Sequence, residues 1–455
     1  MLWAAILASS MGFIDASVTA IAMPAMRAAL GASLAEAQWI NAAYLLALSA
    51  LVLVGGAAGD RFGTARVFVW GIWIFTLGSL ACAGAQDAGQ MIAARAVKGV
   101  GAALMVPGSM AMVSRAWPRE ERGRALGMWA SASTMTTALG PVLGGALITW
   151  GGELGWRLIF ALNLPLGLLA VWLIRGRTPG DRGKPGVRVD VPGAALASAG
   201  LALLAWALIA PEAPGWLWGV ALAALAGFLA WERVTPAPML RLGLFRSRVL
   251  ALTNLVTLAL YFALNGVMFY LPMAAVSAWG VSALEVTAAF LPVSVLIALL
   301  SAPAGQMADR WGAGVLMAAG SALVACAYAG LWLAAPLGQF WAHVVPLAVL
   351  AGLGLGLVVA PLTAAAMQGA EEGEQGAASG LNNAVARVAG LVAVALLGRV
   401  AAWAYGPGAP GFGLEGAGTA HLAATGAGFG TVALIASLAA ALAALLALAV
   451  PRPVR

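Results

Sequence analysis

Four charged side chains lie deep within long apolar stretches of this sequence: Asp15, Arg95, Lys98 and Arg387. A charge is costly to hold at the depth of a lipid bilayer, so an ionisable residue there is a functional hypothesis by default. Asp15 is the only acidic residue that we place deep in such a stretch. We therefore predict that Asp15 takes up and releases a proton. The alternative is a structural carboxylate that a neighbouring cation satisfies permanently.

The elements that must position these residues are membrane-spanning helices. Hydrophobic residues make up 62% of the chain, charged residues only 9%, and the mean hydropathy is +0.95. Soluble proteins carry about 25% charged residues. The apolar segments exceed the ~18 residues that a spanning helix needs, and only a helix satisfies its own backbone in lipid. We predict an all-α integral membrane protein with fourteen spans, at 3–24, 38–58, 66–84, 90–113, 126–149, 157–174, 191–210, 216–231, 249–271, 283–304, 314–334, 342–366, 377–400 and 425–449.

The basic residues fix the sidedness of these spans. If the first helix enters from the cytoplasm, most lysines and arginines fall in inner loops, whereas Arg27, Arg157 and Arg399 fall on the outer side. This bias places both termini in the cytoplasm by the positive-inside rule. The net charge of +7 therefore indicates topology and not nucleic-acid binding, and the expected location is the cell's inner membrane.

This topology gives the charged residues comparable depths. At about 1.5 Å per helical residue, Asp15 lies roughly 18 Å from the inner end of its helix, and Arg95 roughly 7 Å from the outer end of its own. Arg95 is thus the natural partner of Asp15. Lys98, one turn deeper, can also pair with Asp15, or its side chain can extend toward the membrane surface. Arg387 has two equal alternatives. It can pair with backbone carbonyls or another helix, or it can have a role in a cavity.

A charged pattern, GxxxDRxG, occurs twice, 249 residues apart (309 − 60), each time after a long apolar segment. Its members are Gly56, Asp60, Arg61 and Gly63, and then Gly305, Asp309, Arg310 and Gly312. Capped turns between helices are one interpretation. The equal placement also predicts two related bundles, as in transporters with internal repeats. The expected organisation is a six-helix bundle at 1–175, linkers at 176–248 that flank two inserted spans at 191–210 and 216–231, and a second six-helix bundle at 249–455.

Other ordered motifs accompany the duplicated loops. The first span contains the segment IDASVTAIAMP at 14–24, and the fourth span contains RAVKGVG at 95–101. A GPVLGG segment at 140–145 is followed by WRLIFALNLP at 156–165. In this order, these motifs resemble the major facilitator superfamily, and specifically its fourteen-helix drug:proton antiporter branch. Ala20 departs from the asparagine that is usual in that branch.

The resemblance implies a proton-coupled secondary exporter of amphipathic small molecules or drugs, working by alternating access. It also implies that the first and fourth spans adjoin, and that the two Asp-Arg loops hold the cytoplasmic side shut, with Gly56 and Gly305 allowing close helix approach. Glycines four residues apart let two helices touch. The GPVLGG segment matches the antiporter motif of this branch, whose residues here are Gly140, Pro141, Gly144 and Gly145. We expect a helix contact at this motif to seal one bundle against the other.

The deep charges bear on the substrate. One negative and three positive groups leave a balance of +2 among the residues named above, so a neutral, zwitterionic or anionic amphipath is as credible as a cationic drug. Several polar residues in the later spans can either contact substrate or pack against other helices. They are Asn254, Tyr261, Asn265, Asn382 and Asn383.

Absent motifs narrow the function. The two lysines, Lys98 and Lys184, do not occur in a GxxxxGK[ST] loop, so we expect no ATP-driven step. No arrangement of nucleophiles or paired carboxylates indicates an enzyme, and no metal or cofactor site is predicted. The expected partners are a small-molecule substrate, protons and the bilayer, with no nucleic acid, and we expect a monomer. The alternatives are a dedicated metabolite exporter or importer of the same fold and a non-transporting membrane sensor.

Overall fold

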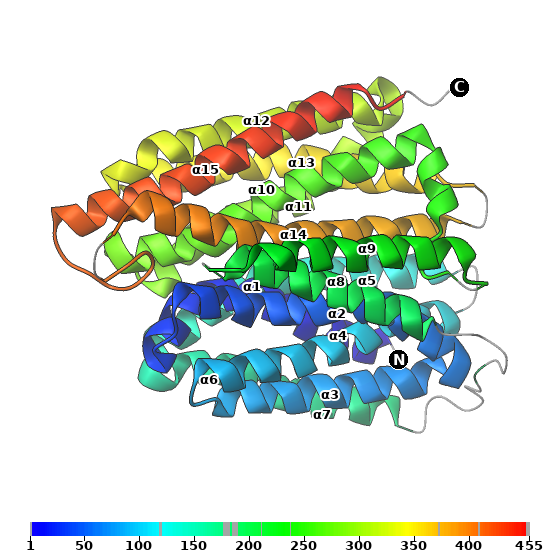
Figure 1. Ribbon diagram of the computed structural model, residues 1–455. Coiled ribbons are helices and arrows are strands. Elements are labelled where there is room, and N and C mark those ends of the chain that lie inside the picture. The colour runs from blue at the N-terminus through cyan, green and yellow to red at the C-terminus, as the bar shows by residue number, and fades with distance from the viewer. Residues whose placement is uncertain are drawn as a thin grey trace. The chain divides into compact units, whose positions relative to one another are not determined.

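The computed structural model describes residues 2–117, 121–175, 183, 190–210, 212–236, 238–371, 374–407 and 410–451. Within these residues the chain forms helices and no strand (Figure 1). Most of the predicted linker between 175 and 190 lies outside the described residues. The helices of the first half are α1 (Leu2–Leu30), α2 (Leu34–Phe62), α3 (Thr64–Gly84), α4 (Ala88–Ala116), α5 (Arg122–Gly151), α6 (Gly155–Ala161), α7 (Asn163–Ile174), α8 (Val191–Ile209) and α9 (Gly215–Val234). Those of the second half are α10 (Arg248–Ala278), α11 (Ala283–Trp311), α12 (Ala313–Ala334), α13 (Val345–Gln368), α14 (Gln375–Tyr405) and α15 (Thr419–Leu448).

Every predicted span lies in helical structure, which confirms the all-α membrane fold. By length and composition, 13 helical segments of the described chain can cross a membrane. One of them, Leu139–Ile174, is 36 residues long and contains parts of two predicted spans. A turn at Gly152, whose φ is +57°, separates α5 from the helices after it. Fourteen spans are therefore consistent with the helices.

The sixth predicted span, 157–174, is divided into α6 and α7. Pro165 is the third residue of α7, and a proline lacks the N–H that would bond to the carbonyl four residues earlier. That carbonyl belongs to Ala161, at which α6 ends. The break therefore follows from the sequence of this segment.

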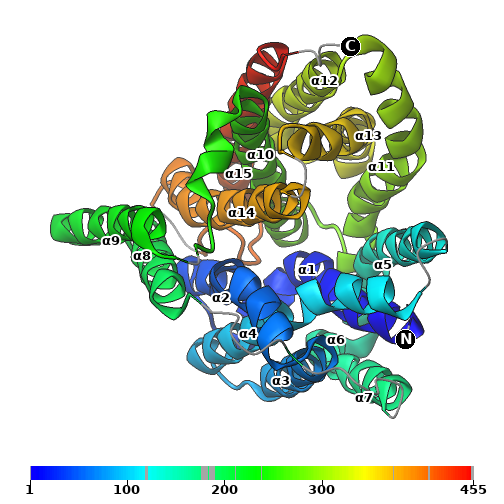
Figure 2. The ribbon, with the colours of Figure 1, turned by 90° about the vertical axis from the view of Figure 1, so that its right-hand side faces the viewer.

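The chain divides into two units, Met1–Met239 and Leu240–Arg455. In the first unit α4 packs against α2 and α3, α1 packs against α5, and the α8–α9 hairpin contacts α2 through α8 (Figure 2). The two inserted helices thus group with the first unit. The short helix Leu242–Arg246, which we predicted to be part of a linker, packs against α10 in the second unit.

The second unit repeats the helix pairs of the first. Here α13 packs against α11 and α12, and α10 packs against α14 and α15. The pairs of α13 correspond in order to those that α4 makes with α2 and α3, and the pair of α10 with α14 corresponds to the pair of α1 with α5. This correspondence is the internal duplication that the repeated motif predicts.

The helices α2 and α11 share their length and their N-terminal cap. Both helices are 29 residues long and both begin with a capping box, Ser33 with Glu36 and Ser282 with Glu285. In each, the serine hydroxyl accepts from the glutamate N–H at 3.2 Å and the glutamate carboxylate accepts from the serine N–H at 2.8 Å. The duplication therefore extends from the motif loops back through the whole preceding helix.

Glycines make the helix contacts of the first unit very close. A Cβ added at Gly78 in α3 would lie 2.9 Å from the backbone N and 3.0 Å from the Cα of Lys98 in α4. Gly219 in α9, by contrast, has nothing within 4 Å of such a Cβ. We expect Gly78→Ala to push α3 away from α4 and to destabilise the protein by about 1–3 kcal/mol, the usual cost of overpacking.

The measurement for Gly78→Ala is the melting temperature of purified protein in detergent. Gly219→Ala is the matched control, because alanine favours a helix over glycine by about 1 kcal/mol and no neighbour opposes it. A Gly78→Ala protein as stable as the Gly219→Ala protein would contradict the close packing described here.

Candidate functional site

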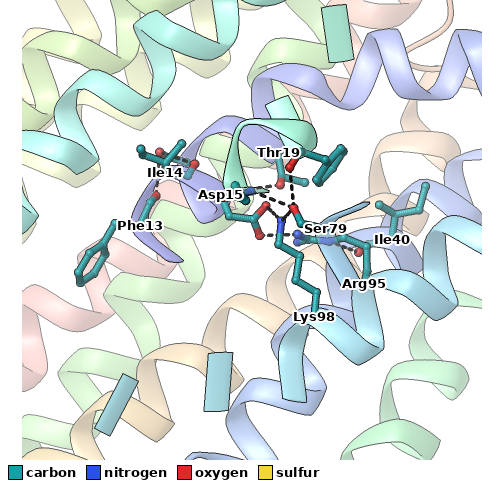
Figure 3. Close-up of polar contacts among 11 residues, drawn as sticks. Phe13, Ile14, Asp15, Thr19, Ile40, Ser79, Arg95 and Lys98 are labelled. Carbon is teal, nitrogen blue, oxygen red and sulfur yellow. Dashed lines mark hydrogen bonds and ion pairs between the residues drawn. The ribbon is translucent and has the colours of Figure 1, made fainter. Parts of the chain in front are cut away.

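Asp15 is enclosed within the first unit and binds two cations. Its side chain, on α1, is held by Arg95 and Lys98 of α4, and the three residues are 0–1% exposed (Figure 3). Arg95 Nη1 lies 2.6 Å from Asp15 Oδ2, and Lys98 Nζ lies 2.5 Å from Asp15 Oδ1. The predicted pairing of Asp15 with Arg95 is therefore present, and Lys98 completes it. These three residues are referred to below as the buried ion cluster.

The local helix geometry explains why both cations reach one carboxylate. Arg95 and Lys98 are three residues apart, so they lie on the same face of α4. Within α1, the Thr19 hydroxyl donates to the Asp15 carbonyl oxygen at 2.7 Å. The absence of a side chain at Gly78 brings the backbone of α3 against Lys98.

Arg95 has further contacts that fix its orientation. Its Nε donates to the carbonyl oxygen of Ile40 in α2 at 3.1 Å. The guanidinium carbon lies 4.3 Å from the centroid of the Tyr44 ring, also in α2, which is a cation–π distance. Arg95 thus joins α1, α2 and α4 through one side chain.

Lys98 contacts side chains of α3 and α6 in addition to Asp15. Its Nζ donates to Ser79 Oγ at 2.8 Å and lies 4.6 and 4.7 Å from the ring centroids of Phe75 and Phe160. Ser79 Oγ in turn donates to the Phe160 carbonyl oxygen at 2.9 Å, and Asn163 Nδ2 donates to Ser79 Oγ at 2.9 Å. Ser79 and Asn163, both 0–2% exposed, are members of the site that the sequence analysis did not assign.

The signal for these two residues is present in the sequence. Ser79 is a polar residue within an apolar helix, and Asn163 belongs to the WRLIFALNLP segment. Neither observation alone separates a member of an ionic site from an ordinary packing residue.

The antiporter motif packs against α1, the helix that carries Asp15. A Cβ at Gly140 of α5 would collide with the Ser17 hydroxyl of α1, and a Cβ at Gly144 would lie 2.5 Å from Val18 Cγ1. Pro141 and Gly145 are buried in the same helix. The close contact that these glycines allow is with α1, within the first unit. A seal between the two bundles stays a prediction.

The two Asp-Arg loops have the same local structure. Gly63 follows α2 with φ +102°, and Gly312 follows α11 with φ +94°, so each loop ends in a conformation that favours glycine. The preceding charged residues are exposed: Asp60, Arg61, Asp309 and Arg310. Their predicted role as a gate is not tested by these positions.

The first glycines of the two motifs make ordinary contacts. A Cβ at Gly56 would lie 3.8 Å from Pro107 Cβ, and one at Gly305 would lie 3.9 Å from Ala360 Cβ. In α2 the very close approach, to the Ala103 carbonyl group, occurs instead at Gly55.

In the second unit, a face of α10 meets α14 through polar residues. Asn382 Nδ2 donates to Thr257 Oγ1 at 2.6 Å and to Asn254 Oδ1 at 3.4 Å. The Arg387 guanidinium is close enough to the Tyr261 hydroxyl to interact with it electrostatically.

The two remaining polar candidates of this unit bond to their own helices. Asn265 donates to the Tyr261 carbonyl oxygen at 2.8 Å and lies beside Gly390 of α14. Asn383 is exposed and donates to the Ser379 carbonyl oxygen at 3.2 Å. Of the described His, Cys, Asp and Glu side chains, no three or more form a group that could hold a metal ion.

Comparison with known proteins agrees with this architecture. The sequence model described as "Major Facilitator Superfamily" matches residues 5–394. The methylenomycin A resistance protein of Bacillus subtilis is 31% identical over 415 residues, which cover 88% of this chain and 87% of that protein. The tetracenomycin C resistance and export protein of Streptomyces glaucescens is 30% identical, with 87% and 75% covered.

Among solved structures, a bacterial homologue of the human lysosomal transporter Spinster has a similar fold. The TM-score is 0.71, the identity is 15%, and the match covers 99% of this chain and 96% of that one. At this identity the similarity concerns the fold alone.

Proposed function

Because this chain belongs to the Major Facilitator Superfamily and is a multi-pass membrane transporter, we propose that it is a proton-driven antiporter that exports amphipathic small molecules by alternating access. The observation that carries the proposal is the buried ion cluster, in which one carboxylate and two cations meet at 0–1% exposure. An ionisable group at this depth is costly to maintain, which favours a functional role.

The arrangement of the cluster supports proton coupling. Two cations and one anion leave a net charge of +1 when all three groups are ionised. Gain or loss of one proton changes this charge and with it the ion pairs that join α1 to α4. Such a change alters the relative stability of two conformations, as coupling requires.

The internal duplication supports alternating access. Transporters of this kind are built from related repeats around a binding site near the membrane midplane. The paired motif loops at Gly63 and Gly312 are the proposed cytoplasmic gate, and both termini are proposed to lie in the cytoplasm. The inner membrane of the cell is the proposed location, and a monomer is the proposed working unit.

The names of the relatives support export of small amphipathic molecules. One is a methylenomycin A resistance protein and another a tetracenomycin C resistance and export protein. In the second unit, the polar face of α10 and α14 near Arg387 is the proposed place of substrate contact. The balance of +2 among the deep charges makes neutral, zwitterionic or anionic substrates as credible as cationic ones.

The test is transport by purified protein in liposomes with an imposed pH gradient. Methylenomycin A and tetracenomycin C serve as probes, and a pH-sensitive dye in the lumen reports protons. We expect the gradient to drive at least one probe against its concentration, with proton movement in the opposite direction.

Two other results would redirect the assignment. Probe movement that ignores the pH gradient would contradict antiport. If neither probe moves while a metabolite does, the dedicated metabolite exporter or importer becomes the better description. Protein-free liposomes and liposomes with the Asp15→Asn protein are the controls.

A further inference from the structure

We propose that Lys98 is the group that binds and releases the coupled proton, and that Asp15 is its permanent counter-ion. This inference rests on the proposed function, because it names the proton-binding atom of that antiporter. It gives to Lys98 Nζ the role that the sequence analysis gave to Asp15.

The first observation is that each oxygen of the Asp15 carboxylate is paired with a cation. Oδ2 accepts from Arg95 at 2.6 Å and Oδ1 accepts from Lys98 at 2.5 Å, at 0–1% side-chain exposure. An ionised carboxylate only accepts hydrogen bonds. A proton added to either oxygen would remove the negative charge that both of these cations contact.

The second observation is the charge that each protonation state leaves in the enclosed site. With all groups ionised the cluster carries +1, from two cations and one anion. Protonation of Asp15 would leave two neighbouring cations and a charge of +2. Loss of a proton from Lys98 would leave the neutral pair of Asp15 and Arg95 and a charge of 0. Because an uncompensated buried charge is strongly unfavourable, the exchange between +1 and 0 is the accessible one.

The third observation is that the surroundings of Lys98 suit both of its forms. As an ammonium, Lys98 donates to Asp15 and Ser79. As a neutral amine it has a lone pair, which the Ser79 hydroxyl can satisfy by turning from the Phe160 carbonyl oxygen to Nζ, while Asn163 still donates to Ser79 Oγ. Rotation of the Ser79 hydroxyl therefore lets the site form hydrogen bonds with either form of Lys98.

The other groups around Lys98 do not compete for this role. The Arg95 guanidinium keeps its proton in proteins. Tyr44 of α2 contacts Arg95 through its ring, and Cys82 of α3 is a buried thiol. A phenol and a thiol are ordinarily uncharged at neutral pH.

The proposed step is a simple proton exchange. When the site opens to water, one Nζ–H bond breaks, the electron pair stays on nitrogen, and the proton passes to water. The reverse step takes a proton from water on the other side of the membrane. Asp15 and Arg95 remain an ion pair throughout.

The test counts protons released by purified protein in detergent when the buffer is changed from mildly acidic to mildly alkaline. The wild type is compared with Lys98→Met, which is unbranched and permanently neutral, and with Lys98→Arg, which stays positive. Infrared difference spectra of the wild type and Asp15→Asn report whether a protonated carboxylic acid forms. No transport substrate is needed.

We expect each Lys98 variant that remains folded to release one proton fewer per chain than the wild type. We also expect no carboxylic-acid band that Asp15→Asn removes. Because Lys98→Arg adds bulk in a tightly packed site, Lys98→Met decides the question if the arginine variant misfolds.

The result that contradicts the role of Lys98 differs from the result that contradicts the antiporter itself. If Lys98→Met releases as many protons as the wild type and a carboxylic-acid band disappears in Asp15→Asn, then Asp15 is the carrier and the inference fails while the antiporter remains. If the wild type releases the same number of protons as every variant and shows no gradient-driven transport, the proposed function fails. The inference then fails with it.

Discussion

Asp15→Asn is expected to abolish transport driven by a pH gradient. The substitution keeps the size of the side chain but removes the only negative charge of the cluster, so Arg95 and Lys98 remain as two neighbouring cations at 0% exposure. Breaking a buried ion pair by removing one partner costs about 3–5 kcal/mol. We therefore expect a lower melting temperature together with the loss of gradient-driven transport in liposomes.

Asp87→Asn is the matched control for this substitution. Asp87 is exposed and caps α4 by accepting from the Gln90 N–H at 2.8 Å, and asparagine caps a helix about as well as aspartate. The control should keep both stability and transport. Adding Lys98→Met to Asp15→Asn removes one of the two uncompensated cations and should restore part of the lost stability. Normal gradient-driven export by the Asp15→Asn protein would remove Asp15 from the mechanism.

Arg95→Ala is expected to reduce transport at least about tenfold, equivalent to about 1.4 kcal/mol or more in the rate-limiting barrier. The change removes the bond to Asp15 at 2.6 Å, the bond to the Ile40 carbonyl oxygen at 3.1 Å and the contact with the Tyr44 ring. A carbonyl oxygen and half of a carboxylate are then buried without these donors. The measurements are the initial rate of probe transport and the melting temperature.

A second arginine separates loss of stability from loss of function. Arg157 donates to the carbonyl oxygens of Ala83 and Ala85, at 2.6 and 2.7 Å, and stacks on Trp156, but it lies outside the cluster. Arg157→Ala should cost about 1–3 kcal/mol of stability and leave transport coupled to protons. If the two variants lose transport equally, destabilisation alone explains the effect of Arg95→Ala.

The fold could largely be predicted from the sequence because lipid restricts the choices. Apolar length alone located the predicted spans 191–210 and 283–304, which appear as Val191–Ile209 and Ala283–Trp311. The repeated glycine-aspartate-arginine pattern indicated the duplication, which the capping boxes of α2 and α11 extend. A rise of about 1.5 Å per residue was enough to place Asp15 and Arg95 at matching depths.

The neighbours of Lys98 could not be predicted in the same way. Helices that are apolar on all sides carry little periodic signal for which face meets which partner. Ser79, Phe75 and Phe160 reach Lys98 only because α3 packs against α4 and α6 packs against α3. The division of the sixth span was missed because hydropathy does not register the effect of Pro165 on the carbonyl of Ala161.

Among the described residues, the buried ion cluster has no counterpart at the equivalent positions of the second unit. The offset of 249 that relates the motif loops places Asp15 opposite Leu264, Arg95 opposite Val344 and Lys98 opposite Leu347, all apolar. Within the described residues, the buried ion cluster is therefore present in one unit only. Under the mechanism proposed above, each polypeptide holds a single cluster of this kind for H⁺.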